Sequence, residues 1–406
     1  MKTMALSWRY LWSRPLGAAL NVVLLSLGLA SISFLLLLSF QLDKAFDKDL
    51  AGIDAVVGAK GSPMQLILCG VFHMDVPPGN VPLKAVQALQ ANPLVASVLP
   101  LSLGDSFQGF RIVGSSHDYV THYGATFAQG GLWGAPMEVV LGATAANKLG
   151  LHMGNTFVGS HGLGAGGHVH AEDPYTVVGI LRPTGTVIDR LIVTDTASAW
   201  KVHEDHHAGH HDLDDHDEDH AVKESEREVT LALVHYKTPL AAMSFPRWVN
   251  TTTAMQAASP AFEITKLLGM LGLGTDVLRA FAGVLLLTAG LSVFIALLNA
   301  VRERRADLAL LRMLGAPPRK IAALLLCEAL WLGLLSAVIS VAAGQALTLL
   351  IGWMLQLDNS LLIGGLAWPA ELLWVPALAC VISLAAAVVP TVGAYRVSVL
   401  ELLQGR

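Results

Sequence analysis

One segment of the chain is unusually dense in side chains that bind metals. Imidazoles and carboxylates alternate between residues 203 and 220. Both are ligands for zinc and other divalent first-row metals, and i, i+4 spacing of two histidine pairs would place imidazoles on one helical face. We therefore predict a zinc-binding loop, and the alternative is a solvated acidic loop without a ligand. The candidate ligands are His203, His206, His207, His210, His211, His216 and His220.

A second, smaller group of histidines follows a glycine-rich stretch at residues 159–167. His168 and His170 are two positions apart, which would place both rings on one face of a strand. They are further candidate metal ligands. The glycine-rich stretch itself contains no lysine, so it predicts a flexible loop instead of a phosphate cradle.

The sequence contains no recognisable catalytic constellation. The motifs GxxxxGK[ST], GxSxG and HExxH are absent, so neither P-loop nucleotide binding nor the common hydrolase mechanisms are predicted. Cys69, Cys327 and Cys380 form neither a CxxC motif nor a disulfide framework. We expect a protein that is not an enzyme, with zinc at the histidine-rich loop as its one hypothetical cofactor.

The composition indicates a membrane protein. Of 406 residues, 53% are hydrophobic and 14% are charged, whereas soluble domains carry about 25% charged residues. The formal net charge of −5 supplies no basic field for a phosphate backbone. An ordinary cytosolic protein, a disordered chain and a nucleic-acid-binding protein are therefore excluded.

Four apolar stretches are long enough to cross a bilayer. About 20 helical residues span about 30 Å of hydrocarbon. The first stretch is too long for a signal-peptide core and lacks a convincing cleavage site, so it is interpreted as a retained helix. The predicted transmembrane helices are residues 17–40, 277–301, 321–351 and 372–395.

Basic residues near these helices predict their orientation. Lys and Arg gather in residues 1–16, 302–320 and 396–406, and the loop 352–371 has neither. Because basic flanks stay in the cytoplasm, residues 41–276 are expected outside. Tryptophan, tyrosine and arginine in residues 1–16 suit a cytoplasmic interfacial helix.

The large outer segment is expected to be globular. Short β-branched runs mixed with helical patterns favour an α+β domain, long enough to bury its own core. Helical extensions at its two ends, as far as Leu50 and from near Phe262, would form a stalk. The runs are residues 53–57, 111–113, 138–141, 175–178, 191–193 and 229–234, and the helical patterns are residues 83–90 and 143–149.

Glu328 is the one ionisable residue well inside a predicted transmembrane helix. An intramembrane acid is costly, so a functional or pairing role is the default hypothesis. Pairing with Arg312, Arg319 or Lys320 is favoured over an ion relay, because one acid among four helices is too little for a proton pathway.

Several segments together resemble the MacB/FtsX family of ABC transporter permeases, which includes lipoprotein-release permeases. Residues 301–316 look like the family's RxxEIxxLRxxGA segment, with Asp307 where the family usually has Glu. Glu328 matches the acid that often follows. Pro390, Arg396 and Glu401 resemble the C-terminal signature, with Val399 where proline is common. Residues 138–142, 148–154 and 175–181 resemble the outer domain, whereas the insert at 203–228 is not part of the general pattern.

The resemblance implies a permease in a bacterial inner membrane. It would work as a homodimer or a paired permease, with a separate ABC ATP-binding subunit that holds ATP and Mg²⁺. It implies mechanotransmission, in which ATP hydrolysis moves the outer domain during export or extraction of a substrate. The histidine-rich loop adds hypotheses of a role in zinc homeostasis and of a periplasmic metal-binding or outer-membrane partner. The alternatives are an FtsX-like module that activates an extracytoplasmic partner and a lipoprotein-release permease. The implied ATPase-coupling residues are Arg302, Arg304, Arg305, Asp307, Arg312, Gly315, Arg319 and Lys320.

Overall fold

The computed structural model divides into two compact units. It describes residues 3–13, 15–162, 173–208, 227–303, 310, 313, 315–357 and 366–395. The membrane unit comprises residues 1–43, 270–354 and 363–406, and the globular unit comprises residues 44–269 and 355–362. Three helices contain residues of both units. Each unit is described separately below.

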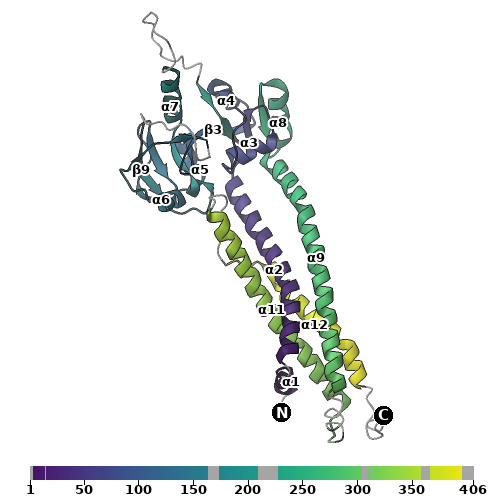
Figure 1. Ribbon diagram of the computed structural model, residues 1–406. Coiled ribbons are helices and arrows are strands. Elements are labelled where there is room, and N and C mark those ends of the chain that lie inside the picture. The colour runs from purple at the N-terminus through teal and green to yellow at the C-terminus, as the bar shows by residue number, and fades with distance from the viewer. Residues whose placement is uncertain are drawn as a thin grey trace, which may run out of the picture. The chain divides into compact units, whose positions relative to one another are not determined.

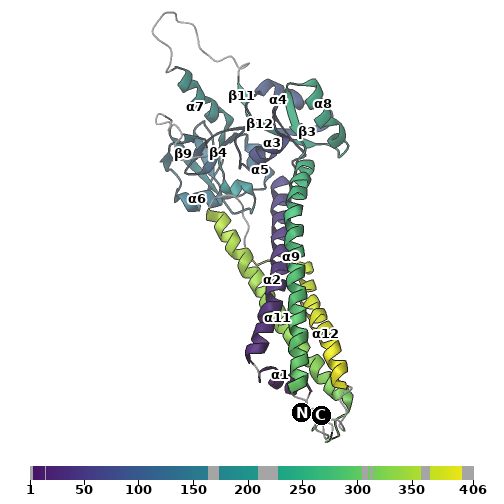
Figure 2. The same ribbon diagram turned by 45° about the vertical axis from the view of Figure 1, so that its right-hand side comes forward.

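Four long helices lie side by side in the membrane unit (Figures 1 and 2). They contain four candidate membrane spans, at Pro15–Leu50, Asp276–Arg302, Pro318–Met354 and Ala370–Val392. The large domain lies between the first and second spans, so the predicted fold class is confirmed. The helical elements are α1 (Thr3–Leu11), α2 (Pro15–Leu50), α9 (Pro260–Glu303), α11 (Pro318–Leu357), the 3₁₀ helix η2 (Ala370–Leu373) and α12 (Trp374–Tyr395).

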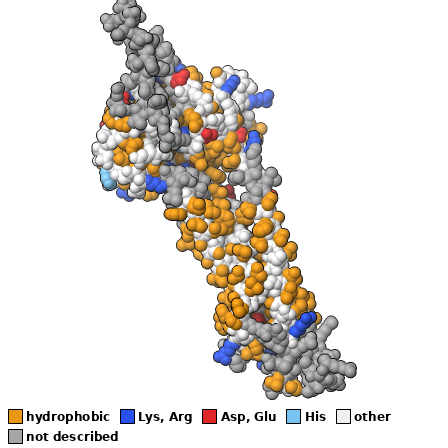
Figure 3. Space-filling view, viewed as in Figure 1, with side chains coloured by type: hydrophobic (Ala, Val, Ile, Leu, Met, Phe, Trp, Pro, Cys, Tyr) orange, Lys and Arg blue, Asp and Glu red, His pale blue; other side chains and the backbone are white. Residues whose placement is uncertain are grey.

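Hydrophobic side chains cover the visible face of these helices (Figure 3). Inside the unit, small residues allow close helix contacts, as is common where no water drives association. A Cβ on Gly344 of α11 would lie 2.6 Å from Ser33 Cβ of α2. A Cβ on Gly333 would lie 3.0 Å from the backbone oxygen of Ala379 in α12. These glycines therefore set how closely α11 approaches its neighbours.

The globular unit is built on one mixed sheet of 11 strands, in the order β13-β1-β12-β3-β4-β10-β6-β9-β5, with β7 beside β9 and β8 beside β3. The pairs β10–β4 and β6–β9 are parallel. Strands β2 and β11 form a separate pair. The strands are β1 (Ala55–Ala59), β2 (Val81–Pro82), β3 (Val95–Phe107), β4 (Phe110–Ser115), β5 (Phe127–Gly130), β6 (Glu138–Leu141), β7 (Thr156–Phe157), β8 (Ser160–His161), β9 (Tyr175–Leu181), β10 (Ile192–Asp195), β11 (Glu228–Val229), β12 (Leu231–Tyr236) and β13 (Met255–Ala258).

Both faces of the sheet are buried at β12. Successive side chains of a strand point to opposite faces. Leu231 and Leu233 of β12 accordingly belong to one core cluster, and Ala232 and Val234 belong to another. Helices supply the covering residues, for example Leu66 of α3 in the first cluster and Phe245 of α8 in the second. These helices are α3 (Pro63–Gly70), α4 (Leu83–Leu89), α5 (His117–His122), α6 (Ala143–Leu149), η1 (Val187–Arg190), α7 (Thr196–Ala208) and α8 (Ala241–Thr252).

One predicted run differs from the structure. Residues 229–234 were expected as a single strand, but β11 ends at Val229 and β12 begins at Leu231. Thr230 lies between them and bonds to β3: its Oγ1 accepts from Leu103 N at 2.9 Å, and its own N donates to Leu101 O at 2.9 Å. This side-chain bond interrupts the backbone ladder, and no hydrophobic pattern reveals it.

Candidate functional site

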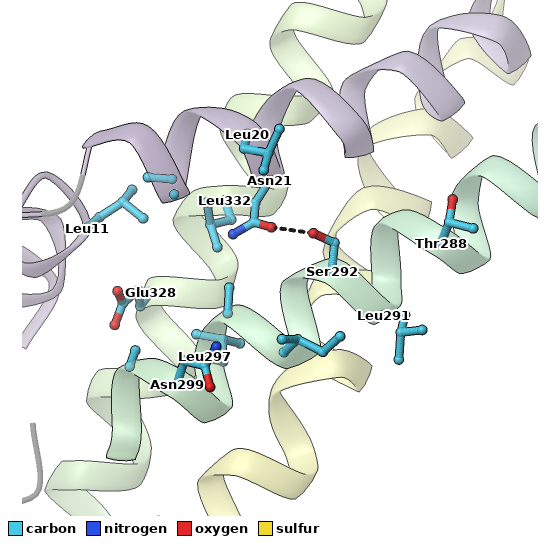
Figure 4. Close-up of a pocket in the computed structure, with 15 residues that line it drawn as sticks. Leu11, Leu20, Asn21, Thr288, Leu291, Ser292, Leu297, Asn299, Glu328 and Leu332 are labelled. Atoms are coloured by element: carbon cyan, nitrogen blue, oxygen red, sulfur yellow. Dashed lines mark hydrogen bonds between the residues drawn. The ribbon is translucent and has the colours of Figure 1, made fainter. Parts of the chain in front are cut away.

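A cavity of about 500 Å³ lies in the membrane unit, between α1, α2, α9 and α11. This volume is in the range of ligand pockets. Its buried wall includes Leu11, Asn21 and Glu328, and exposed apolar residues such as Leu20 and Leu291 border it. Figure 4 shows Glu328 and Thr288 toward opposite ends of the lining residues. The cavity therefore places the buried polar side chains of Asn21 and Glu328 within a mainly apolar lining.

Asn21 and Ser292 join two helices across this cavity. The Ser292 hydroxyl donates to Asn21 Oδ1 at 2.8 Å (Figure 4). Asn21 is only 5% exposed. A polar side chain at membrane depth is costly unless it finds a partner, so this bond stabilises the α2–α9 pair. The sequence analysis missed both residues, although an Asn inside an apolar span is itself a usable signal.

Glu328 is 5% exposed and lies on α11 in the cavity wall. Arg319 and Lys320, two of its suggested partners, are exposed near the start of α11, and Arg312 lies outside the described residues. Its pairing with these cations stays a prediction.

The implied ATPase-coupling residues extend from the last turn of α9 to the first turn of α11. Arg302, Gly315, Arg319 and Lys320 are exposed. Gly315 has φ +90°, a left-handed conformation that favours glycine, and α11 begins three residues later at Pro318. This turn starts α11 with proline in its first turn, where the missing N–H costs nothing. Arg304, Arg305, Asp307 and Arg312 lie outside the described residues.

The side chains of the predicted metal ligands are not among those that the structure describes. His203, His206 and His207 lie within α7, but their side chains are not described, and His168, His170, His210, His211, His216 and His220 lie outside the described residues. Among the residues that the structure does describe, no group of three or more His, Cys, Asp or Glu side chains could hold a metal ion. The zinc hypothesis stays a prediction.

The globular unit contains a buried polar cluster that sequence reasoning missed. His73 Nε2 lies 2.9 Å from Tyr119 Oη, and Arg111 donates to Cys69 Sγ at 3.6 Å. All four side chains are buried. Burial lowers the pKa of His73 well below its usual value, and the charges of Arg111 and Arg190 add to this effect.

The Cys69 thiol in this cluster is not a reactive one. Burial raises its pKa to about 11, although the neighbouring Arg111 opposes the increase. A thiol with so high a pKa holds almost no thiolate at neutral pH, and the thiolate is the nucleophile. The cluster is therefore suited to positioning its helices and strands, with uncharged His73 and Cys69.

Two family models match the chain, and together they include residues of both units. Residues 18–229 match the model of the MacB-like periplasmic core domain, and residues 279–399 match the model of the FtsX-like permease C-terminal region. No curated protein matches the chain.

Two solved structures are similar to part of the chain. The periplasmic region of MacB from Actinobacillus actinomycetemcomitans is 11% identical, with a TM-score of 0.35, covering 54% of this chain and 95% of that one. The extracellular domain of the noncanonic ABC-type transporter YknZ from Gram-positive bacteria is 10% identical, with a TM-score of 0.32, covering 51% of this chain and 100% of that one.

Proposed function

Because the chain belongs to the family of MacB/FtsX-like ABC permeases, we propose that it works by mechanotransmission. It is the transmembrane component of an ABC transporter, a multi-pass inner-membrane protein with a periplasmic domain. Permeases of this family work with an ABC ATP-binding subunit. In the proposal, ATP hydrolysis in that separate subunit moves the periplasmic globular unit, and this movement exports or extracts a substrate.

The observation that carries the proposal is the continuity of two helices. The boundary between the units falls between Asp43 and Lys44 inside α2, and between Gly269 and Met270 inside α9. Proline occurs only at the first position of each helix, so neither contains an internal proline kink. An unbroken helix is a stiff element that can transmit displacement along its axis.

The apolar character of the spans supports the same proposal. An aqueous path through a bundle is normally lined by many polar or charged residues. In the described part of the membrane unit, Glu328 is the one buried charged side chain. Movement of the globular unit therefore suits this protein better than passage of a polar substrate between the helices.

A helix break at the unit boundary tests the proposal. Asp43→Pro removes a backbone donor and clashes with the preceding turn, whereas Asp43→Ala keeps the helix. Each full-length variant is assembled with the ATP-binding subunit in lipid nanodiscs, and hydrogen exchange in the globular unit is compared with and without ATP. We expect Asp43→Ala to retain the ATP-dependent change, and Asp43→Pro to lose most of it while ATP hydrolysis continues. An unchanged response in Asp43→Pro would contradict mechanical coupling through α2.

A further inference from the structure

The last turns of α2 are embedded in the core of the globular unit. Residues 44–50 belong to that unit. The rings of Phe46 and Phe72 pack edge to face with centroids 5.2 Å apart, and Leu50 packs against the same core cluster. The helix ends at Leu50, and the turn that follows contains Gly52, whose φ of +76° is left-handed and leads into β1. This end of the helix is therefore fixed within the domain and is not a loose linker.

Asp49 makes the polar contact at this end. Its side chain is 5% exposed, and its Oδ1 accepts a hydrogen bond from the backbone N–H of Val187 at 2.7 Å. The nearby guanidinium of Arg190, which is itself buried, also attracts this carboxylate. Burial of a carboxylate costs free energy unless hydrogen bonds and opposite charges stabilise it. The contacts with Val187 and Arg190 therefore fix the position of the Asp49 side chain. Both partners come from one element, η1.

η1 is in turn held rigidly. The carboxylate of Asp189 accepts bonds from the backbone of Thr184 at 2.9 Å and of Gly185 at 2.8 Å, and from the Thr184 hydroxyl at 2.9 Å. These bonds fix the turn that precedes η1. On the other side, Gly142 N donates to Leu191 O at 2.9 Å, and a Cβ on Gly142 would overlap the Ile188 carbonyl. η1 has little freedom to absorb a displacement.

The chain leaves η1 directly into β10, which lies inside the sheet between β4 and β6. A force on η1 therefore reaches the middle of the sheet without passing through a flexible loop. The covalent path from α2 instead passes through the Gly52 turn to β1, which lies one strand from the sheet edge. The Asp49 contact is thus a more direct route to the centre of the sheet.

We propose that Asp49 is the positioning residue that couples α2 to the central strands of the globular sheet, through Val187 and Arg190 of η1. The inference rests on the proposed mechanotransmission and names the contact through which it acts. Loss of the contact removes the hydrogen bond that joins α2 to η1, so displacement of α2 reaches β10 less efficiently.

The test compares Asp49→Ala and Asp49→Asn with Asp47→Asn. Asp47 is exposed on the same turn of α2 and serves as the matched control. Asp49→Asn keeps an oxygen that can accept a hydrogen bond from Val187 N–H but removes the charge beside Arg190. This variant still tests the contact if Asp49→Ala does not fold. Each full chain is assembled with its ATP-binding subunit in nanodiscs. The measurements are the ATP hydrolysis rate, Tm, and the ATP-dependent change in hydrogen exchange of residues 187–195.

We expect ATP hydrolysis within about twofold of wild type in all three variants. The exchange response at residues 187–195 should fall at least fivefold in Asp49→Ala, fall partly in Asp49→Asn, and persist in Asp47→Asn. A merely structural role would lower Tm but leave the ATP-dependent response of the folded protein intact, and that result overturns the inference. A full response in Asp49→Ala overturns it while the proposed function stands. If wild type itself shows no ATP-dependent response anywhere in the globular unit, the proposed function fails and the inference fails with it.

Discussion

At the scale of single residues, the Asn21–Ser292 bond is an interhelical polar contact at the cavity. We expect the effects of Asn21→Ala and Ser292→Ala on the free energy of unfolding to be non-additive. The coupling energy should be about 0.6 kcal/mol and at most about 1.7 kcal/mol, the range measured for such bonds between membrane helices. The free energy of unfolding of the full chain in bicelles, measured for the two single variants and the double variant, gives this value.

Thr288 supplies the control for this cycle, because its hydroxyl bonds to Leu285 O of its own helix at 2.9 Å. Asn21→Ala and Thr288→Ala should therefore be additive within about 0.5 kcal/mol. Additivity of Asn21→Ala with Ser292→Ala as well would show that the polar contact does not stabilise the α2–α9 pair.

His73 predicts a pH dependence of stability. Burial holds its pKa in the folded protein well below the value of about 6.5 in an unfolded chain. Below pH 6.5 the unfolded chain binds a proton that the folded chain does not. The free energy of unfolding should then fall with falling pH, by up to about 1.4 kcal/mol per pH unit for this group. The contribution of uncharged His73 to the free energy of unfolding is fully present above about pH 6.5, and it is lost as the pH falls below that value.

The variant His73→Asn isolates this contribution. His73 has φ +55°, and asparagine tolerates this left-handed conformation better than most residues. Tm of the full chain is measured at pH 7.5 and pH 5.5, with His152→Asn, at an exposed position, as the control. Wild type and His152→Asn should lose more Tm on acidification than His73→Asn. Equal losses in all three would rule out His73 as the titrating group.

The histidine-rich loop predicts zinc binding from residue types alone. Zinc is titrated by calorimetry into the full-length protein and into a variant lacking residues 203–220. We expect micromolar or tighter binding that disappears with the deletion and weakens between pH 7.5 and pH 6, because only neutral imidazole binds the metal. Equal binding by both proteins would make the loop a passive linker and remove the basis for a role in zinc homeostasis.

At the scale of elements, the turn at Gly315 fixes where α11 begins. Its φ of +90° strains any β-branched side chain, so Gly315→Val should distort the implied docking segment. We expect Gly315→Val to lower co-purification of the ATP-binding subunit severalfold, and Gly315→Asn to lower it less. Gly283→Ala is the control, since Gly283 is helical and a Cβ there meets no neighbour. Full recovery of the subunit with Gly315→Val would place docking elsewhere.

At the scale of the whole molecule, the resemblance to the family predicts a homodimer. The exposed apolar residues of α2 and α9, such as Leu20, Leu27 and Leu287, are compatible with either lipid or a second copy. We expect native mass spectrometry of the complex released from nanodiscs to contain two copies of the 43.0 kDa chain. One copy of the chain per complex, at several protein concentrations, would contradict the prediction.

Much of the architecture was determined by the sequence itself. Four apolar stretches and their basic flanks are local patterns, and bilayer thickness converts them directly into spans and orientation. The helical patterns at residues 83–90 and 143–149 likewise correspond to α4 and α6. Glu328 was identifiable because a single acid in an apolar run is visible without knowledge of its neighbours.

The tertiary structure alone decided which residues meet across long separations. Asn21 and Ser292, and Asp49 and Val187, are far apart in the chain, and no local pattern encodes their contacts. The order of the 11 strands and the break at Thr230 depend on pairing with β3. The buried state of His73 likewise depends on the elements packed around it. Periodicity and composition indicate whether a segment faces water, lipid or a protein core. The contacts between distant residues depend on how the whole chain packs.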